Sequence, residues 1–162
     1  KRWSDQFMPE IKSRLGQALI GEPPTEDDQQ RNTDLIVLKM DAVRIGCRVR
    51  KFNQITYAGE FTIRSGRPSG VKTELTKIIE GWGDYFFYGF SNQDETALYR
   101  WLIGDLKAFR IWYSRQLAKN YGRPPGIPQR NHDGSSSFYA FRWSEIAEFV
   151  IAGNHPVWRE AA

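Results

Sequence analysis

The stretch "VRIGCRVRKF" (43–52) has the alternation of a β-strand with two unlike faces. Successive side chains of a strand point to opposite sides of its sheet. One side carries four apolar residues, Val43, Ile45, Cys47 and Val49. The other side carries three arginines and a glycine, Arg44, Gly46, Arg48 and Arg50. The apolar side is predicted to anchor the strand. The arginine side is predicted either to be solvated, as one face of an antiparallel sheet often is, or to meet something anionic.

The residues around this stretch predict a three-stranded antiparallel meander over 34–66. The segment "DLIVLKM" (34–40) is apolar on both faces, which is typical of a central strand. The segment "EFTIRSG" (60–66) alternates in its turn and places Glu60, Thr62 and Arg64 on one side. The chain therefore contains three consecutive predicted strands, and the second of them carries the arginines.

The predicted meander would gather like charges. If 43–52 and 60–66 are neighbours, Arg48, Arg50 and Arg64 share a face, and like charges on neighbouring strands destabilise a sheet. Two kinds of group would offset them, and the sequence leaves both open. One is a bound phosphate. The other is a carboxylate of the chain itself, with Asp34, Glu60 and Glu74 as the candidates.

The rest of the chain alternates helices and strands. Helices are predicted over 9–20, over 71–82 with Thr73 or Ser69 near the start, from an Asp105 cap to about Lys119, and over 144–151 with Ser144 as the N-cap. Strands are predicted over 84–90, 98–106 and 138–143, and residues 120–137 are predicted to be irregular. The order α-β-β-β-α-β-β-α-β-α indicates an α/β (α+β) fold in which helices flank a mixed β-sheet.

Composition limits the classes of protein to be considered. The 162 residues are 40% hydrophobic, which favours a single globular domain over 1–162. The net charge of +4 and the pI of about 9.3 permit nucleic acid as a partner without requiring it. The single cysteine excludes a disulfide framework within the chain and favours a cytoplasmic location. No apolar run approaches the length of a membrane span.

The predicted element order and the stretch "TDLIVLKMDAVRIGCRVRK" (33–51) resemble the PD-(D/E)XK nuclease superfamily, whose core is restriction-endonuclease-like. In that family an Asp on one strand and a Glu-x-Lys on the next hold Mg²⁺, because hard divalent cations prefer carboxylate oxygens. The bound metal activates water for attack on a phosphodiester. Here Asp34 takes the Asp place, but Arg48-Val49-Arg50 occupies the place of the Glu-x-Lys.

The resemblance implies a set of site residues. A second register keeps a carboxylate, Glu60, on the following strand, and Glu10 loosely matches a glutamate that the family often places on its first helix. The implied catalytic residues are therefore Asp34, Glu60 and Glu10, with Asp34 and Glu60 as ligands of Mg²⁺ or Mn²⁺. The implied function is metal-dependent hydrolysis of nucleic acid, or nucleic-acid binding by a site that has lost catalysis.

Positive charge is concentrated in the same part of the chain. Residues 39–77 hold nine Lys or Arg against three Asp or Glu. The predicted contacts with DNA or RNA phosphates are Arg44, Arg48, Arg50, Arg64, Arg67 and Lys72. The alternative is a non-enzymatic interaction protein that docks an acidic partner or belongs to a larger assembly. A homo-oligomer is compatible with either function.

We expect Asp34→Asn to abolish Mg²⁺-dependent hydrolysis of DNA or RNA, because Asn keeps the shape of the side chain and removes the charge that a hard cation needs. If Asp34 only pairs with Arg48 or Arg50, the variant will instead lose stability. Melting temperature and hydrolysis, measured on the same samples, separate the two roles. A wild-type protein that is inactive on single- and double-stranded DNA and RNA, with both Mg²⁺ and Mn²⁺, would leave only the binding function.

Overall fold

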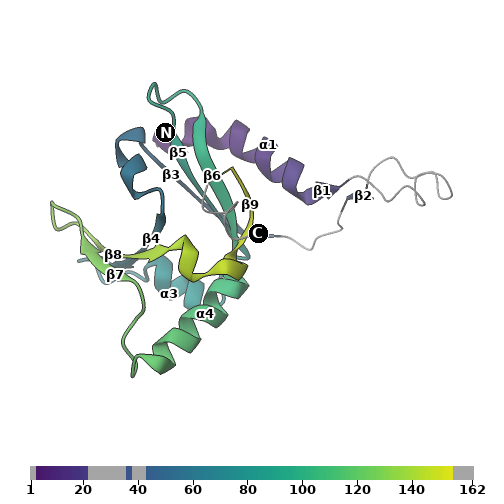
Figure 1. The fold of residues 1–162 in the computed structure, drawn as a ribbon. Coiled ribbons are helices and arrows are strands. Elements are labelled where there is room, and N and C mark those ends of the chain that lie inside the picture. The colour runs from purple at the N-terminus through teal and green to yellow at the C-terminus, as the bar shows by residue number, and fades with distance from the viewer. Residues whose placement is uncertain (1–2, 22–35, 38–42, 155–162) are drawn as a thin grey trace. The chain divides into compact units, whose positions relative to one another are not determined.

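The computed structural model describes residues 3–21, 36–37 and 43–154 (Figure 1). The chain divides into two compact units, Lys1–Val43 and Arg44–Ala162, and each is treated separately below. The prediction of one domain over 1–162 stays a prediction. No helix in the described ranges is both long and apolar enough to cross a membrane.

The first unit contains one helix and one short strand pair. A 3₁₀ turn, η1 (Trp3–Phe7), leads into α1 (Met8–Leu19), which confirms the helix predicted over 9–20. Strand β1 (Ile20–Gly21) pairs antiparallel with β2 (Ile36–Val37). Of the strand predicted over 34–40, only β2 is described. Asp34 lies outside the described residues.

The second unit contains two β-sheets. A mixed four-stranded sheet has the order β3-β5-β6-β9, with β3 parallel to β5 and the other neighbours antiparallel. An antiparallel three-stranded sheet has the order β4-β8-β7. The strands are β3 (Ile45–Arg50), β4 (Glu60–Gly66), β5 (Tyr85–Ser91), β6 (Leu98–Asp105), β7 (Ile127–Arg130), β8 (Ser137–Arg142) and β9 (Val150–Gly153). The mixed α+β class is thus confirmed, while the restriction-endonuclease-like assignment stays a prediction.

The predicted meander is wrong, because β3 and β4 belong to different sheets. The residues between them form the 3₁₀ segment η2 (Phe52–Tyr57), which carries the chain from one sheet to the other. The neighbour of β3 is instead β5, where six of seven residues are buried. A strand this apolar is most stable between two others, and β5 lies between β3 and β6.

Two helices of this unit begin at the predicted caps. In α3 (Glu74–Ile79), the Thr73 hydroxyl accepts a hydrogen bond from the Thr76 N–H. In α4 (Leu106–Lys119), the Asp105 carboxylate accepts bonds from the N–H groups of Lys107 and Ala108, at 2.6 and 3.2 Å. Both side chains satisfy N–H groups that a helix start leaves without partners. The prediction for α4 is confirmed at both ends, whereas α3 is shorter than the predicted 71–82.

The C-terminal third differs from its prediction in two places. The segment predicted to be irregular contains β7, which forms a hairpin with β8. The helix predicted over 144–151 is replaced by two 3₁₀ turns, η3 (Trp143–Glu145) and η4 (Ala147–Phe149), followed by β9. Packing overrides helix propensity here. The ring of Phe149 is fully buried and lies so close to Gly104 on β6 that a Cβ there would be 2.1 Å from it.

The core of this unit is aromatic and centres on Phe61 of β4, whose exposed fraction is 0%. The Phe61 ring stacks on Trp143 at a centroid distance of 4.3 Å and on Phe149 at 5.0 Å. It also contacts rings from both sheets and from α4, namely Phe86, Tyr88, Phe109 and Phe141. Offset and edge-to-face pairs of this kind add stabilisation beyond the area that they bury. The two sheets and α4 therefore pack around one aromatic core.

We expect Asp105→Ala to lower the free energy of unfolding by about 1 kcal/mol, because two N–H groups at the start of α4 lose their acceptor. Asp105→Asn should restore most of this loss. Urea denaturation monitored by circular dichroism measures both values. Asp94→Ala removes an exposed carboxylate in the β5–β6 loop and serves as the control. Equal losses in the Asp105→Ala and Asp94→Ala variants would contradict the capping role.

Candidate functional site

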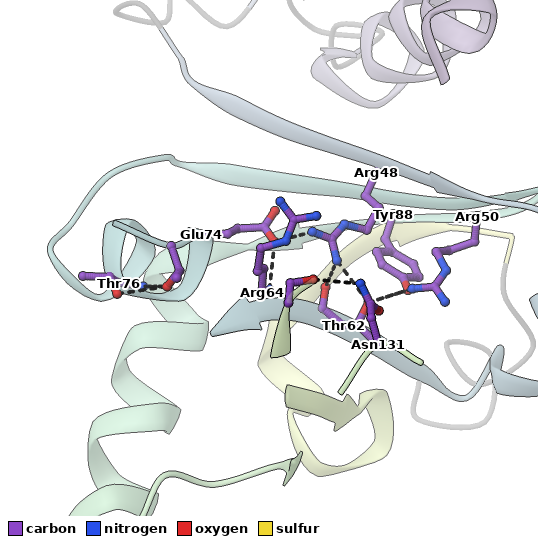
Figure 2. A network of polar contacts seen from close by, with 10 residues as sticks. Arg48, Arg50, Thr62, Arg64, Glu74, Thr76, Tyr88 and Asn131 are labelled. Carbon is purple, nitrogen blue, oxygen red and sulfur yellow. Dashed lines mark hydrogen bonds and ion pairs between the residues drawn. The ribbon is translucent and has the colours of Figure 1, made fainter. Parts of the chain in front are cut away.

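Two arginines of β3, Arg48 and Arg50, point toward the other sheet of the second unit, whereas Arg44 is exposed. Arg48 and Arg50 are half-buried, and both donate hydrogen bonds to Thr62 on β4, in the other sheet (Figure 2). Cys47, on the opposite side of β3, is exposed. Val49, on the same side as Cys47, is buried, so each side of β3 is partly covered. The guanidinium groups of Arg48 and Arg50 connect the two sheets.

Arg48 is held by a carboxylate of the chain. Its guanidinium donates to the carbonyl oxygen of Thr62 at 2.7 Å, to the Thr62 hydroxyl at 3.1 Å and to Glu74 Oε2 on α3 at 2.5 Å. The same Glu74 oxygen accepts the main-chain N–H of Arg64 at 3.1 Å. The sequence leaves open whether a bound phosphate or a carboxylate of the chain balances the arginine charges. Arg48 is balanced by a carboxylate of the chain, Glu74.

Arg50 has a different environment. Its guanidinium donates to the Thr62 hydroxyl at 3.1 Å and to the side-chain oxygen of Gln54 at 3.0 Å. Both acceptors are neutral. Among the described residues no carboxylate forms an ion pair with Arg50. Because a guanidinium offers more N–H donors than these two bonds use, Arg50 keeps both its charge and spare donors for a ligand.

A pocket of about 210 Å³ opens beside Arg50, between the two sheets. Strand register explains its walls, since Arg50 is the Cα partner of Phe90, and Thr62 is the partner of Ala140 on β8. Segment η2 adds Gln54 and Tyr57 to the lining. The pocket thus has an arginine at one wall and aromatic rings at others, and it lies entirely within the second unit.

Two further polar groups in the pocket are unused by the fold. Glu60 begins β4, and Gln129 lies on the exposed edge strand β7. In the described part of the chain, neither the Glu60 carboxylate nor the Gln129 amide makes a hydrogen bond or ion pair. The Tyr88 hydroxyl, by contrast, is paired with the Thr62 hydroxyl at 3.3 Å. The pocket therefore offers a cation, an anion and an amide to a ligand.

The other predicted phosphate contacts lie outside this pocket. The Arg44 guanidinium lies over the exposed Trp82 ring, 5.8 Å from its centroid. Lys72 pairs with Glu80 at 2.7 Å, and Arg67 is exposed in the loop before α3. Arg64 is half-buried near Glu74. Of the six predicted basic residues, only Arg50 lines the pocket.

Of the three predicted catalytic residues, Glu10 and Glu60 lie in different units, and Asp34 lies outside the described residues. Glu10 pairs with Arg14 one helical turn away, at 3.3 Å. No three His, Cys, Asp or Glu side chains within 3–21, 36–37 and 43–154 form a group that could hold a metal ion. The role of Asp34 and Glu60 toward Mg²⁺ or Mn²⁺ stays a prediction.

The single cysteine has no feature of a nucleophile. Desolvation raises the pKa of the Cys47 thiol above its ordinary value, although the residue is exposed as a whole. A raised thiol pKa lowers the fraction of thiolate, the reactive form, at neutral pH. Cys47 therefore fits an inert position in β3.

Comparison of the chain with protein-family models, with curated proteins and with solved structures gives no match. The function is therefore inferred from the geometry and chemistry of the pocket.

Of the ten residues that line the pocket, sequence reasoning named two as candidate site residues, Arg50 and Glu60. Gln54 and Tyr57 lie in a segment that the sequence marks only as a connection, and Gln129 lies in the segment predicted to be irregular. No local pattern distinguishes these residues from ordinary surface positions. Only the strand pairing of β7 with β8 and of β8 with β4 brings Gln129 to the wall that Thr62 and Glu60 form.

We expect Glu74→Gln to lower the free energy of unfolding by roughly 2 kcal/mol, because the half-buried Arg48 loses its counter-charge. Glu80→Gln, which breaks the more exposed pair with Lys72, should cost less than about 1 kcal/mol. Chemical denaturation of the two variants gives both values. Equal losses would show that the Arg48–Glu74 pair contributes no more than a surface ion pair.

Proposed function

We propose that this protein binds single-stranded nucleic acid, and that the pocket beside Arg50 receives one nucleotide of the strand. The observation that carries the proposal is the Arg50 guanidinium, which is half-buried, bonded only to neutral groups within the described residues, and adjacent to a pocket with aromatic walls. A nucleotide combines the two features that such a site complements, an anionic phosphate and an aromatic ring.

The charge of Arg50 favours an anionic ligand. A half-buried cation without a counter-charge gives up part of its solvation, and a bound anion compensates that loss. A phosphate also matches the planar, forked arrangement of guanidinium donors. Because Arg48 is already neutralised by Glu74, Arg50 is the arginine of β3 that remains for a phosphate.

The aromatic side chains favour an unpaired base. Tyr57 is 60% exposed at the end of η2 and lines the pocket together with Phe138 and Phe90. Stacking of a base on an aromatic ring contributes about 1–3 kcal/mol per base. Since bases within a duplex are already stacked on each other, such rings serve single strands, loops or ends.

The size of the pocket favours one unit of a longer chain. Its volume of about 210 Å³ lies below the roughly 300–1,000 Å³ of pockets that enclose a whole drug-sized ligand. One unit of a strand fits such a space, with the rest of the ligand outside it. The remaining phosphates of the strand then lie outside the pocket, where exposed basic side chains such as Arg67 contribute to the salt-dependent part of the affinity.

We expect the wild-type protein to bind oligonucleotides of roughly 16 nucleotides with an affinity that falls as salt rises. Arg50→Gln should weaken binding and reduce the slope of log Kd against log salt concentration by about 0.7, the contribution of one phosphate on a single strand. Tyr57→Ala should weaken binding roughly tenfold and leave the slope unchanged. Fluorescence anisotropy of labelled single-stranded DNA and RNA over a salt series measures both quantities.

Arg115→Gln is the matched control, because Arg115 is exposed on α4 and contributes nothing to the pocket lining. It should leave the affinity and the slope close to those of the wild type. Equal effects of Arg50→Gln and Arg115→Gln would overturn the assignment of the phosphate contact. A wild-type protein that binds polyglutamate but neither DNA nor RNA would overturn the proposed function and favour an acidic protein partner.

A further inference from the structure

We infer that the pocket selects guanine among the four bases, through the two free oxygens of the Glu60 carboxylate. This inference rests on the proposed function, because it concerns the base that enters the same pocket. It assigns Glu60 to ligand recognition and requires no metal ion at this residue.

Glu60 and Arg50 line the same pocket without pairing with each other. Glu60 and Thr62 lie on the same side of β4, two residues apart, which separates their Cα atoms by about 7 Å. The Thr62 hydroxyl is the anchor of the Arg50 guanidinium. The Glu60 carboxylate and the Arg50 guanidinium are therefore held at different positions along β4. They form no salt bridge with each other, so the pocket between them stays open to a ligand.

The carboxylate of Glu60 is prepared to accept hydrogen bonds. An ionised carboxylate is an acceptor only, with two oxygens side by side. Within the described residues neither oxygen has a protein partner, although Glu60 is half-buried at the pocket wall. Binding a pair of neighbouring N–H donors would satisfy both oxygens at once, and bonds to an ionised acceptor are the stronger kind.

Guanine is the base that offers this pair of donors. Its Watson–Crick edge carries the N1–H and the N2 amine next to each other. Adenine and cytosine place one amine beside a ring nitrogen that accepts, and thymine and uracil place one imino N–H between two carbonyl oxygens. The edge of each of these bases would turn at least one lone pair toward the carboxylate. A single good two-point contact discriminates by about 1–3 kcal/mol, or roughly fivefold to 150-fold in affinity.

Gln129 completes the recognition. Its side-chain amide lines the same pocket from strand β7 and makes no other bond within the described part of the chain. The amide nitrogen donates, so it complements the O6 oxygen that lies next to N1 of guanine. A carboxylate and an amide together thus match two donors and one acceptor on a single base edge.

The test uses thymidine oligonucleotides that carry one central guanine, adenine, cytosine or hypoxanthine. A single guanine keeps four-stranded assemblies from forming. We expect the wild-type protein to bind the guanine strand roughly tenfold tighter than the adenine and cytosine strands. Hypoxanthine keeps N1–H and lacks the N2 amine, so the strand that contains it should bind with intermediate affinity. Fluorescence anisotropy at one salt concentration ranks the four strands.

Glu60→Gln should reduce the preference for guanine to about twofold or less, since an amide presents one acceptor and one donor in place of two acceptors. Its melting temperature should match the wild type, because Glu60 makes no hydrogen bond or ion pair within the described residues. Glu148→Gln, an exposed position outside the pocket, is the control and should keep the preference. An unchanged ranking of the strands in Glu60→Gln would overturn the inference.

Failure of this inference is distinct from failure of the proposed function. If the wild-type protein binds all strands equally and Arg50→Gln still weakens binding, base selection by Glu60 is wrong and nucleic-acid binding stands. If the wild-type protein binds none of the strands, the proposed function itself is wrong, and this inference is overturned with it.

Discussion

The hydrogen bonds and salt bridge of the Arg48 guanidinium are the polar interactions that connect the two sheets of the second unit to α3. The guanidinium links β3, in the four-stranded sheet, to Thr62 on β4, in the three-stranded sheet, and to Glu74 at the start of α3. These are the elements that come one after another between residues 45 and 79. A chain that carries several arginines in this region needs a carboxylate at this point, because otherwise like charges would face each other between the sheets.

Arg48 and Arg50 show how partners separate a structural residue from a ligand-binding one. They lie two residues apart on the same side of β3, and both reach Thr62. Arg48 forms a salt bridge with the Glu74 carboxylate, so its charge is neutralised within the fold. Arg50 donates hydrogen bonds only to the neutral Gln54 amide and Thr62 hydroxyl, so its charge is available to an anionic ligand. A site that leaves a half-buried cation uncompensated reduces the stability of the free protein and recovers that loss when an anion binds.

Local patterns in the sequence predict elements and caps better than they predict neighbours. Asp105 and Thr73 identify helix starts because a cap is a contact within a few residues. The alternation in 43–52 separates two faces correctly, but it does not indicate that β5 rather than β4 lies beside β3, since many later segments compete for that edge. The pocket depends on such pairings. Gln129 lies at the pocket only because β7 pairs with β8 and β8 pairs with β4. No local pattern in the sequence predicts these pairings.

Alternation within β4 places the core and the candidate site on opposite sides of one strand. Phe61 and Ile63 point into the aromatic cluster with exposed fractions of 0%, while Glu60 and Thr62 line the pocket. The packed side holds the backbone of β4 in place, and the hydrogen bond to Thr62 holds the Arg50 guanidinium. A ligand that meets groups fixed in advance loses less free energy to ordering them. Binding then has to order chiefly the exposed side chains at the rim, Tyr57 and Gln129. The tight packing around Phe61 is therefore what allows a small pocket with few polar groups to bind selectively.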